Sequence, residues 1–569
     1  MRVVPDVLGL DKEFDYSVPD GDDTVDVGDL VRIDLHGRRV RAWVVAVDPP
    51  DAHTVGLKPI RSWSSVGPTR DLVELASWAA TRWAGRRRTF LAAASPQRVV
   101  QRMPARPRGR VVAEPRSPAS TRILASGGGV LRLPPASDPL PAVSSAVAFG
   151  PTLVIVPNVD RAMIFAARLR RSGLSVALVP GDWTAAAVGA DVVIGTRTAA
   201  WAPCAGLAAA VVIDEHDESL QEEGSPTWHA RDVVIERCRR LGAPVLLISP
   251  CPTLTAIEWG PVTRPPVERE RRGWAEVEVV DRGDEPPWAR SLVTSPLVEA
   301  LRDHERTVVC VTNTTGRARL LACRTCRELG RCEQCDAAVV QDDGGSLQCN
   351  RCDTRRPLVC LACGAGRFAV LRPGVTRLRE ELEAAAGRPV DAVTGGVDAP
   401  LTGHRVVVGT EAVLHRIDRA DVVAFLEFDR ELLAPRYRAA EQALALVVRA
   451  ARLVGDRTGG GRILLQTFLP EHEVVRAASA GDPDIVVDVD RRRRDELGFP
   501  PFGALAEVAG RGSEAFVRSL PVESGVVVAG DDARYVIKAA SWERLGAVLA
   551  AGVRPSGSRL RIAVDPPRL

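Results

Sequence analysis

Residues 211–219 read VVIDEHDES, and this stretch indicates the class of fold to which the surrounding chain belongs. Three β-branched residues run directly into an acidic pair, Asp214 and Glu215, as at the end of a buried strand. In nucleotide-hydrolysing motors such a strand end holds Mg²⁺, and it works with a glycine-rich phosphate loop of the form GxxxxGK[ST]. The chain has only three lysines, Lys12, Lys58 and Lys538. None of them stands in a GxxxxGK[ST] motif, so no phosphate loop with a lysine precedes the acidic pair.

Strands and helices alternate on both sides of this stretch. The runs TLVIVP, SVALVP, DVVIGT, AAVVID and PVLLIS are short and continuously apolar, which is typical of parallel strands buried on both faces. Helical segments such as VDRAMIFAARLRRSG lie between them, so the sequence predicts a doubly wound α/β domain. A second set of strands, from TVVCVT to RILLQT, predicts a second α/β lobe. Alternating runs before residue 65 predict a β-rich N-terminal domain, and the residues after 499 predict a small domain with strands.

Composition is that of a globular protein, with 46% apolar residues, 26% charged residues and a net charge of +3. The N-terminus lacks the apolar segment of a signal peptide, so we expect a cytoplasmic protein. The charge is unevenly distributed: no acidic residue lies between Leu75 and Ala113, whereas nine arginines lie between Arg82 and Arg110. This arginine excess suits phosphate binding, and a solvated, arginine-rich linker is the alternative.

Eight of the twelve cysteines form four CxxC pairs within residues 323–363, and the other four are isolated in apolar surroundings. Two CxxC pairs supply four thiolates for one tetrahedral Zn²⁺, so the cluster predicts two closed structural zinc sites. Reduced thiols without metal and iron–sulfur ligation are the alternatives. Spacing alone does not fix which pairs share an ion. The pairing that we expect is Cys323, Cys326, Cys360 and Cys363 at one site, and Cys332, Cys335, Cys349 and Cys352 at the other.

Several motifs resemble the PriA family of bacterial primosomal replication-restart proteins, which are superfamily 2 DNA helicases. VVIDEHDESLQEEGSPTWHARDV (211–233) resembles the family's acidic box and the aromatic-rich loop after it, and VVIGTRTAAWAP (192–203) resembles the strand and turn before that box. The four CxxC pairs resemble the zinc-binding insertion of lobe 2. EFDYSVP (13–19) with DLVRIDLHGRR (29–39) resembles the N-terminal domain that captures a 3′ end. DELGFPPFGALAEV (495–508) resembles the C-terminal domain.

The resemblance implies an α/β protein of two RecA-like parallel-sheet lobes, with a double zinc-binding insertion in lobe 2, an N-terminal β-rich DNA-binding domain and a small α+β C-terminal domain. We expect these boundaries: a 3′-end DNA-binding-like domain at 1–96, a basic Pro/Arg/Gly linker at 97–137 in place of the family's winged helix, lobe 1 at 138–290, lobe 2 at 291–322 and 369–498, the cysteine module at 323–368, and the C-terminal domain at 499–569.

The helicase motifs depart from the family's pattern. LRLPPASDPLPAV (131–143) stands where the family has its phosphate loop, and ISPCPTL (248–254) stands where it has Ser-Ala-Thr. RAARLVGDRTGGGR (449–462) replaces the arginine-finger motif. The acidic box Asp214-Glu215-His216 is one acid short. Because phosphoryl transfer depends on electrostatic stabilisation, we interpret this box as a relic with no catalytic role and do not expect ATP as a cofactor.

By resemblance, a set of residues in the N-terminal domain and the aromatic-rich loop would contact DNA: Phe14, Asp15, Tyr16, Gly37, Lys58, Trp228, His229 and Arg231. An aromatic ring would stack on a base, the Asp15 carboxylate would accept from a 3′-hydroxyl, and Lys58 would meet phosphate. The alternatives are a core role for Phe14 and Tyr16, and a purely structural role for the loop residues. Arg86–Arg88 and Arg491–Arg494 are weaker candidates for duplex phosphates.

The function that these residues predict is a component of the replication-restart primosome that binds stalled forks or D-loops and helps to reload the replication machinery, without ATP hydrolysis. Its expected partners are forked and single-stranded DNA, helicase-loading proteins and single-strand-binding protein. We expect no membrane association and a location in the nucleoid region of the cytoplasm. One alternative is an active ATP-dependent 3′-to-5′ helicase, which DNA-stimulated hydrolysis would reveal. The other is a zinc-bearing scaffold that binds forks and plain duplex equally.

Overall fold

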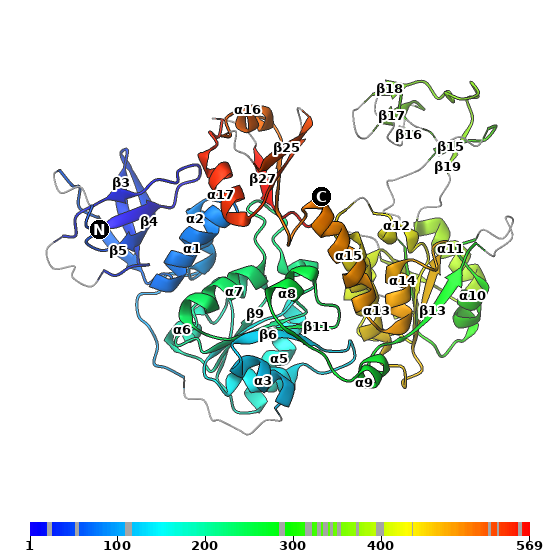
Figure 1. Ribbon diagram of the computed structural model, residues 1–569, viewed down its shortest axis with the longest axis horizontal. Helices are drawn as coiled ribbons and strands as arrows, with labels where there is room; N and C mark the ends of the chain where they lie inside the picture. Colours follow the sequence, from blue (N-terminus) through cyan, green and yellow to red (C-terminus); the bar gives the residue numbers. More distant parts are fainter. Residues whose placement is uncertain are drawn as a thin grey trace. The chain divides into compact units, whose positions relative to one another are not determined.

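The computed structural model describes residues 1–569 apart from short ranges: 20–24, 52–55, 108–115, 284–290, 313–320, 327–329, 331, 334–338, 342–344, 350–353, 371–374, 394–402, 435, 522–524, 532–533 and 556–559. The chain divides into two compact units. Unit 1 contains Met1–Val267, Pro435–Ala445 and Pro483–Leu569, and unit 2 contains Glu268–Ala434 and Leu446–Asp482. Figure 1 traces the elements of both units. No helix in the described ranges is both long and apolar enough to cross a membrane.

The N-terminal domain is a five-stranded antiparallel sheet followed by two helices. Its strands are β1 (Arg2–Pro5), β2 (Phe14–Asp15), β3 (Leu30–Leu35), β4 (Arg38–Ala46) and β5 (Ser62–Ser65), in the spatial order β2-β1-β4-β3-β5. A parallel bridge between Ser17 and Pro59 brings the two edges of the sheet together. Tyr16, Val31, Ile33 and Val44 are buried in the core of this sheet. The helices are α1 (Arg70–Arg82) and α2 (Arg87–Ala94).

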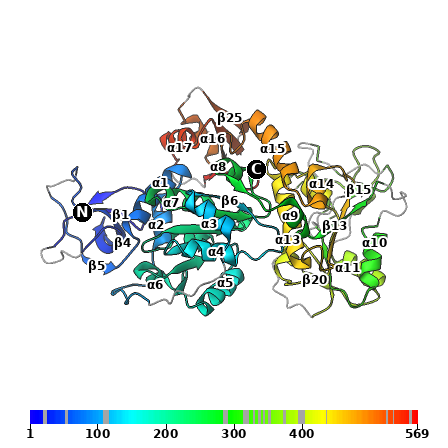
Figure 2. The ribbon, with the colours of Figure 1, turned by 60° about the horizontal axis from the view of Figure 1, so that its bottom comes forward.

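Lobe 1 is a seven-stranded sheet in which every pair of neighbours is parallel, in the order β12-β6-β11-β10-β7-β9-β8. The strands are β6 (Gly128–Arg132), β7 (Thr152–Ile155), β8 (Val176–Leu178), β9 (Val192–Gly195), β10 (Ala209–Ile213), β11 (Val245–Ser249) and β12 (Val262–Thr263). One face carries α3 (Pro118–Ala125), α4 (Leu140–Val147) and α5 (Val159–Arg171), which Figure 2 labels. The other face carries α6 (Trp183–Val188), α7 (Ala230–Leu241) and α8 (Leu254–Trp259).

The start of lobe 1 differs from the expected boundary. Residues 118–132, which we assigned to the linker at 97–137, form α3 and the interior strand β6, which pairs with β11 and β12. The glycines of β6 give it the composition of a linker, but the packing of this strand requires them. A Cβ on Gly128 would lie 2.6 Å from the Val245 carbonyl oxygen, and one on Gly129 would lie 2.8 Å from the Pro261 carbonyl oxygen. Glycine is therefore required for close strand packing here.

Unit 1 also contains the C-terminal domain, whose antiparallel sheet has the order β25-β26-β24-β27. Its elements are α15 (Asp484–Leu497), β24 (Ala504–Ala509), α16 (Ser513–Arg518), β25 (Val526–Asp531), β26 (Arg534–Ala539), α17 (Trp542–Ala551) and β27 (Arg561–Val564). One apolar core joins this sheet to α1, α2 and lobe 1. Within that core Trp83, Phe90, Trp201 and Trp228 contact one another in sequence, with ring centroids 5.1–6.4 Å apart. The N-terminal helices are thus packed into unit 1.

Unit 2 is built on the parallel sheet of lobe 2, in the order β13-β23-β22-β14-β21-β20. Its strands are β13 (Glu276–Asp281), β14 (Val308–Val311), β20 (Asp391–Val393), β21 (Val406–Gly409), β22 (Val422–Phe425) and β23 (Arg462–Thr467). Its helices are α9 (Val267–Arg272), α10 (Ser295–Arg302), α11 (Val375–Ala386), α12 (Asp429–Leu432), the second part of α13 (Ala439–Val454) and α14 (Glu473–Ala480). β13 lies within the range 138–290 that we assigned to lobe 1, but it pairs with β23 of lobe 2.

The cysteine module lies between β14 and α11 in the chain. It contains β15 (Leu321–Cys323) paired with β19 (Phe368–Val370), and the ribbon of β16 (Val339–Gln341), β17 (Leu347–Cys349) and β18 (Arg355–Arg356). The predicted fold class is confirmed: two parallel-sheet lobes, a β-rich N-terminal domain, a cysteine-rich insertion in lobe 2 and a small C-terminal α+β domain.

Candidate functional site

Asp214 is neutralised by a residue of its own lobe. It lies directly after β10, is 2% exposed and has a φ of 57°, a left-handed conformation that is costly for a residue other than glycine. Its carboxylate forms an ion pair with the Arg161 guanidinium of α5. A buried carboxylate needs a positive partner, and in a motor that partner would be a metal ion. Here an arginine already supplies the positive charge.

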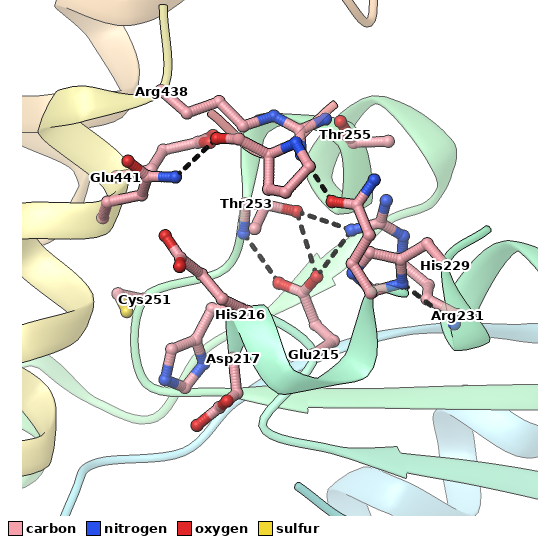
Figure 3. Close-up of a pocket in the computed structure, with 14 residues that line it drawn as sticks. Glu215, His216, Asp217, His229, Arg231, Cys251, Thr253, Thr255, Arg438 and Glu441 are labelled. Atoms are coloured by element: carbon pink, nitrogen blue, oxygen red, sulfur yellow. Dashed lines mark hydrogen bonds and ion pairs between the residues drawn. The ribbon is translucent and has the colours of Figure 1, made fainter. Parts of the chain in front are cut away.

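Glu215 is fully buried, and its carboxylate oxygens accept several hydrogen bonds within the protein. Oε1 accepts from the Thr253 backbone N–H at 2.7 Å, and Oε2 accepts from Thr253 Oγ1 at 3.0 Å and from Arg231 Nη1 at 3.1 Å. Figure 3 shows Glu215 held between Thr253 and Arg231. Burial raises the pKa of Glu215, and the donors from Arg231 and Thr253 oppose that rise. The carboxylate is therefore a fixed acceptor inside the protein.

His216 is tied to the end of the neighbouring strand. The Ser249 hydroxyl oxygen accepts from the Cys251 backbone N–H at 3.1 Å, and it lies 2.7 Å from His216 Nδ1. The Ser249 hydroxyl therefore connects His216 to the backbone of Cys251. The stretch ISPCPTL thus holds the acidic box through Ser249 and Thr253.

A carboxylate also occupies the place where a phosphate loop would act. In parallel α/β sheets the helix that follows such a strand offers its free N–H groups to phosphate. Here β6 is followed by α4, and Asp138 Oδ1 accepts from the Leu140 N–H at the start of α4 at 3.0 Å. Arg168 donates to the same oxygen at 3.1 Å. Partial burial alone would raise the pKa of Asp138, but these two donors lower it.

Arg132, the last residue of β6, is likewise paired within unit 1. Its Nη1 lies 2.6 Å from Asp484 Oδ1 of α15, and Arg264 Nη1 lies 2.7 Å from the other oxygen of the same carboxylate. Arg132 is 3% exposed and Asp484 bridges both cations. Arg132 and Arg264 are thus both paired with a carboxylate of the protein itself.

A small pocket lies beside the acidic box. Its volume is about 40 Å³, room for a few water molecules. Residues from distant parts of unit 1 close it, including Arg438 and Glu441, which Figure 3 shows facing the box. Arg438 Nη2 binds both oxygens of the buried Asp565 carboxylate, at 2.7 and 2.8 Å. The C-terminal segment thus helps to seal this region.

The loop residues that we predicted to contact DNA are buried in this structure. Trp228 is 4% exposed and packs edge-on against Trp201, with centroids 5.8 Å apart. His229 begins α7, and its Nδ1 accepts from the Arg231 N–H at 3.1 Å. Burial, together with the nearby Arg231 charge, lowers the pKa of His229 to about 3. These contacts match the structural role that we gave as the alternative for this loop.

In the N-terminal domain, hydrogen bonds link the segment after β2 to Lys58 and to the turn that follows β3. Lys58 lies beside the strand end because its carbonyl oxygen accepts from the Ser17 N–H at 3.0 Å, one residue after Tyr16. The Tyr16 hydroxyl donates to the Asp34 carbonyl oxygen at 2.9 Å, which brings in the turn that contains Gly37. Tyr16 itself is only 5% exposed and belongs to the core. Lys58 and Gly37 are exposed.

Phe14 and Asp15 form the short edge strand β2. Phe14 is partly buried against the domain core. Asp15 is oriented by Arg2, whose Nε lies 2.9 Å from Oδ1. The same guanidinium reaches Asp51 at 3.0 Å, and these hydrogen bonds raise the pKa of Arg2. Asp15 is thus presented as a carboxylate, an acceptor without a proton to donate.

Four cysteine thiols of the module meet at one point. The sulfurs of Cys323, Cys326, Cys360 and Cys363 all lie within 4.8 Å of one another. The Cys323–Cys363 and Cys326–Cys360 sulfur distances are 3.5 and 3.6 Å. A tetrahedral Zn²⁺ with Zn–S bonds of about 2.3 Å separates its sulfurs by about 3.8 Å, so this group can hold such a metal. Backbone N–H donors, with Cys326 first, lower the pKa of Cys323 to about 6.

The second predicted group is only partly described. Cys332 and Cys349 are buried together in the small core of the module. Cys335 and Cys352 lie outside the described residues, so the second four-cysteine site stays a prediction.

Several paired residues in the region of the acidic box were missing from the sequence interpretation: Arg161, Asp138, Arg438, Glu441 and Asp565. Arg161 lies 53 residues from Asp214, and Arg438 lies 127 residues from Asp565. No local spacing connects such residues. The exception is Asp138, because an aspartate just before an apolar helical segment is a common helix-start signal.

The family model of the 3′ DNA-binding domain of PriA matches residues 2–96. The replication restart protein PriA of Thermotoga maritima is 27% identical over 428 residues, which cover 68% of this chain and 58% of that protein. PriA of Bacillus subtilis is 26% identical over 343 residues, covering 56% and 43%. The probable replication restart protein PriA of Mycobacterium tuberculosis H37Rv is 29% identical over 559 residues, covering 88% and 85%. The chain thus spans about half the length of the first two relatives.

Solved structures of helicases overlap less closely. A DEAD box protein from Methanococcus jannaschii covers 62% of this chain and 86% of its own, at 10% identity and a TM-score of 0.31. The Escherichia coli DEAH/RHA helicase HrpB covers 64% and 43%, at 14% identity and the same TM-score. These similarities are too low to carry an argument about this chain.

The chain therefore joins a domain that matches the 3′ DNA-binding domain of PriA to two parallel-sheet lobes. It is similar to replication restart proteins of the PriA type over most of its length, as its motifs predicted.

Proposed function

We propose that this chain recognises the 3′ end of a DNA strand at stalled or abandoned replication forks and D-loops. There it helps to reload the replication machinery without hydrolysing ATP or unwinding DNA. The observation that carries the proposal is the match of residues 2–96 to a 3′ DNA-binding domain, in which Phe14 and Asp15 form β2 and the Lys58 backbone binds Ser17 just after that strand. The closed acidic box supports the second half of the proposal.

End recognition would use one acceptor and one cation. The Asp15 carboxylate, oriented by Arg2, accepts a hydrogen bond from a 3′-hydroxyl, whereas a 3′-phosphate brings negative charge against it. Lys58 is exposed and meets the phosphate of the terminal nucleotide. A Cβ built on Gly37 meets nothing within 4 Å, so the turn leaves room for the DNA. Phe14, on the same strand as Asp15, would contact a base with its ring.

The electrostatics of lobe 1 support the proposed absence of ATP hydrolysis. Phosphoryl transfer needs free backbone donors, a lysine and a metal-binding carboxylate around the phosphates. Arg161 neutralises Asp214, Arg231 neutralises Glu215, and the Asp138 carboxylate caps α4. A nucleotide would have to displace each of these carboxylate interactions without a lysine to replace them. This is why we propose fork recognition over an active helicase.

Two zinc ions complete the proposed cofactor set. When bound, each ion would supply the fold of part of the cysteine module, because four thiolates leave no open position for chemistry. Cys323, Cys326, Cys360 and Cys363 would hold one ion, and Cys332, Cys335, Cys349 and Cys352 the other. We expect two zinc ions per chain by mass spectrometry under native conditions. Cys360→Ser should release one of them, and a count of one ion in the unaltered protein would refute the second site.

The partners that we propose are forked and single-stranded DNA, helicase-loading proteins and single-strand-binding protein. The test is binding of the zinc-loaded chain to a fork that ends in a 3′-hydroxyl, against the same fork ending in a 3′-phosphate. We expect a clear preference for the hydroxyl. Equal, weak binding to both ends would refute end recognition and favour a zinc-bearing scaffold.

A further inference from the structure

The arginine-rich run in the first part of the chain splits into two structurally different groups. Arg87 forms an ion pair with Glu13, and Arg88 lies 2.7 Å from Asp6. These two arginines of α2 are therefore used within the N-terminal domain. Arg98 and Arg102, ten to fifteen residues later, are exposed, and no ion pair to either is found in the described ranges. No acidic residue lies within Leu75–Ala113 to compete for them.

These later arginines belong to a segment without helix or strand that is anchored at two places, which we call the basic strap (residues 97–107). At its start the Val100 N–H donates to Ser65 Oγ at 2.8 Å, and the Val100 carbonyl oxygen accepts from the Val66 N–H at 2.9 Å. Near its end Arg106 Nε donates to the Gly189 carbonyl oxygen at 3.1 Å, at the end of α6. The strap thus runs from the N-terminal sheet to lobe 1, and all of it lies in unit 1.

The anchoring holds the strap at Val100 and Arg106, on both sides of Arg102. Arg98, Arg102 and Arg106 recur every fourth residue, and the strap has no helix or strand. Fixing the backbone before a ligand arrives lowers the ordering cost of binding. Guanidinium groups without an internal counterion are the groups that bind nucleic-acid phosphates and release the condensed counterions.

We propose that the basic strap binds the phosphate backbone of the duplex that leads away from the 3′ end, with Arg98 and Arg102 as its contacts. The inference rests on the proposed function, because the pocket at Asp15 sets where that duplex begins. The strap starts beside Ser65, which pairs with Leu30 at one end of β3, and the turn with Gly37 follows the other end. Five residue steps of β3 span about 17 Å, which equals about five base pairs of duplex.

The test measures binding of the zinc-loaded full chain to a 3′-hydroxyl fork over a range of salt concentrations. Each phosphate contact contributes about 0.9 to the slope of log affinity against log salt. Arg98→Gln with Arg102→Gln should therefore reduce the slope by about 1.8. The affinity advantage of the unaltered protein should shrink about tenfold between 50 and 200 mM salt. The ratio of affinities for 3′-hydroxyl and 3′-phosphate forks should not change, because the strap does not contact the end.

A matched control is Arg122→Gln with Arg171→Gln, which removes the same charge from exposed positions on α3 and α5. This control should leave the slope unchanged. A fork with uncharged methylphosphonates about five base pairs from the 3′ end should abolish the difference between the strap variant and the unaltered protein. The strap is refuted if its variant keeps the full slope, or if the control lowers the slope equally. If the unaltered protein shows no preference for the 3′-hydroxyl fork, end recognition is refuted instead. The comparison of salt slopes still tests the strap in that case.

Discussion

The acidic box of lobe 1 and the edge strand of the N-terminal domain both carry carboxylates beside arginines, yet they differ in exposure and in what those charges can do. Glu215 is fully buried, and Arg231, its partner, is 2% exposed. Asp15 has an arginine partner too, but it lies on the edge strand β2 and is only partly buried. An ion pair in the interior closes a site, whereas one at a surface orients a group that a ligand can still reach.

The comparison shows how a buried acidic pair can be held by cations of the protein itself. Buried charges are expensive unless they are paired, so each buried carboxylate needs a cation of its own. Arg161 and Arg231 have that role for Asp214 and Glu215. Such pairs matter for folding, and charges in the N-terminal domain should matter for binding. The predictions below test this division.

Arg231→Ala should have the largest effect, because it leaves the Glu215 carboxylate buried without its cation. We expect a loss of about 3–5 kcal/mol in the free energy of unfolding of unit 1, read from denaturant unfolding by tryptophan fluorescence. Arg197→Ala is the matched control, since its pair with Glu222 is about one-third exposed on both sides. That control should cost less than about 1 kcal/mol. Equal losses would show that the buried Arg231–Glu215 pair contributes no more to the free energy of unfolding than a partly exposed ion pair.

Asp15→Ala should change binding more than folding. Removing a charged acceptor from a hydroxyl donor costs about 1.5–3 kcal/mol, so the preference for a 3′-hydroxyl fork should fall by about tenfold to a hundredfold. Asp51→Ala removes the other partner of Arg2 and should keep the preference. If both variants lose it, the effect belongs to Arg2 and the pocket assignment is wrong.

His229 predicts an acid-sensitive interior. Its pKa is about 3 in the folded protein, below the ordinary value of about 6.5, because burial disfavours the charged ring. The unfolded chain takes up this proton as the pH falls below about 6.5, and the folded chain does not. Stability should therefore be complete above that pH and should fall by about 1.4 kcal/mol per pH unit down to about pH 3.

His229→Gln should remove this part of the pH dependence, and His36→Gln, at an exposed turn, should leave it intact. Denaturant unfolding at several pH values gives the two slopes. An unchanged slope in His229→Gln would mean that the ring is protonated in the folded protein.

Asp138→Ala should have the smallest effect. It removes the acceptor for the Leu140 N–H at the start of α4, which costs about 1 kcal/mol of stability. The exposed Asp11→Ala is the control and should cost nothing measurable in a thermal melt. Nucleotide binding by Asp138→Ala would contradict the account, because the freed helix end still lacks a lysine.

Much of the fold followed from local pattern, and most of the site did not. The continuous apolar run before Asp214 predicts a buried parallel strand, and the structure contains β10 there. The spacing of the cysteines identifies the module, whose Cys323, Cys326, Cys360 and Cys363 sulfurs come together. Pairs such as Arg438–Asp565 join segments that only the folded chain brings together. β6 was missed because its glycines resemble a linker.

The burial of Trp228 was also invisible in the sequence. A tryptophan in a polar loop is typical of a base-stacking residue, but here the ring joins the contacts that run from Trp83 through Phe90 and Trp201. Aromatic residues serve either purpose, and only the neighbours decide between them.

The most direct test of the central claim is ATP hydrolysis by the zinc-loaded chain in the presence of forked DNA. We expect phosphate release to equal that of the Glu215→Gln variant, with no stimulation by the fork, because every carboxylate of the acidic box is already paired. A DNA-stimulated release that Glu215→Gln abolishes would show a working motor and would contradict the account.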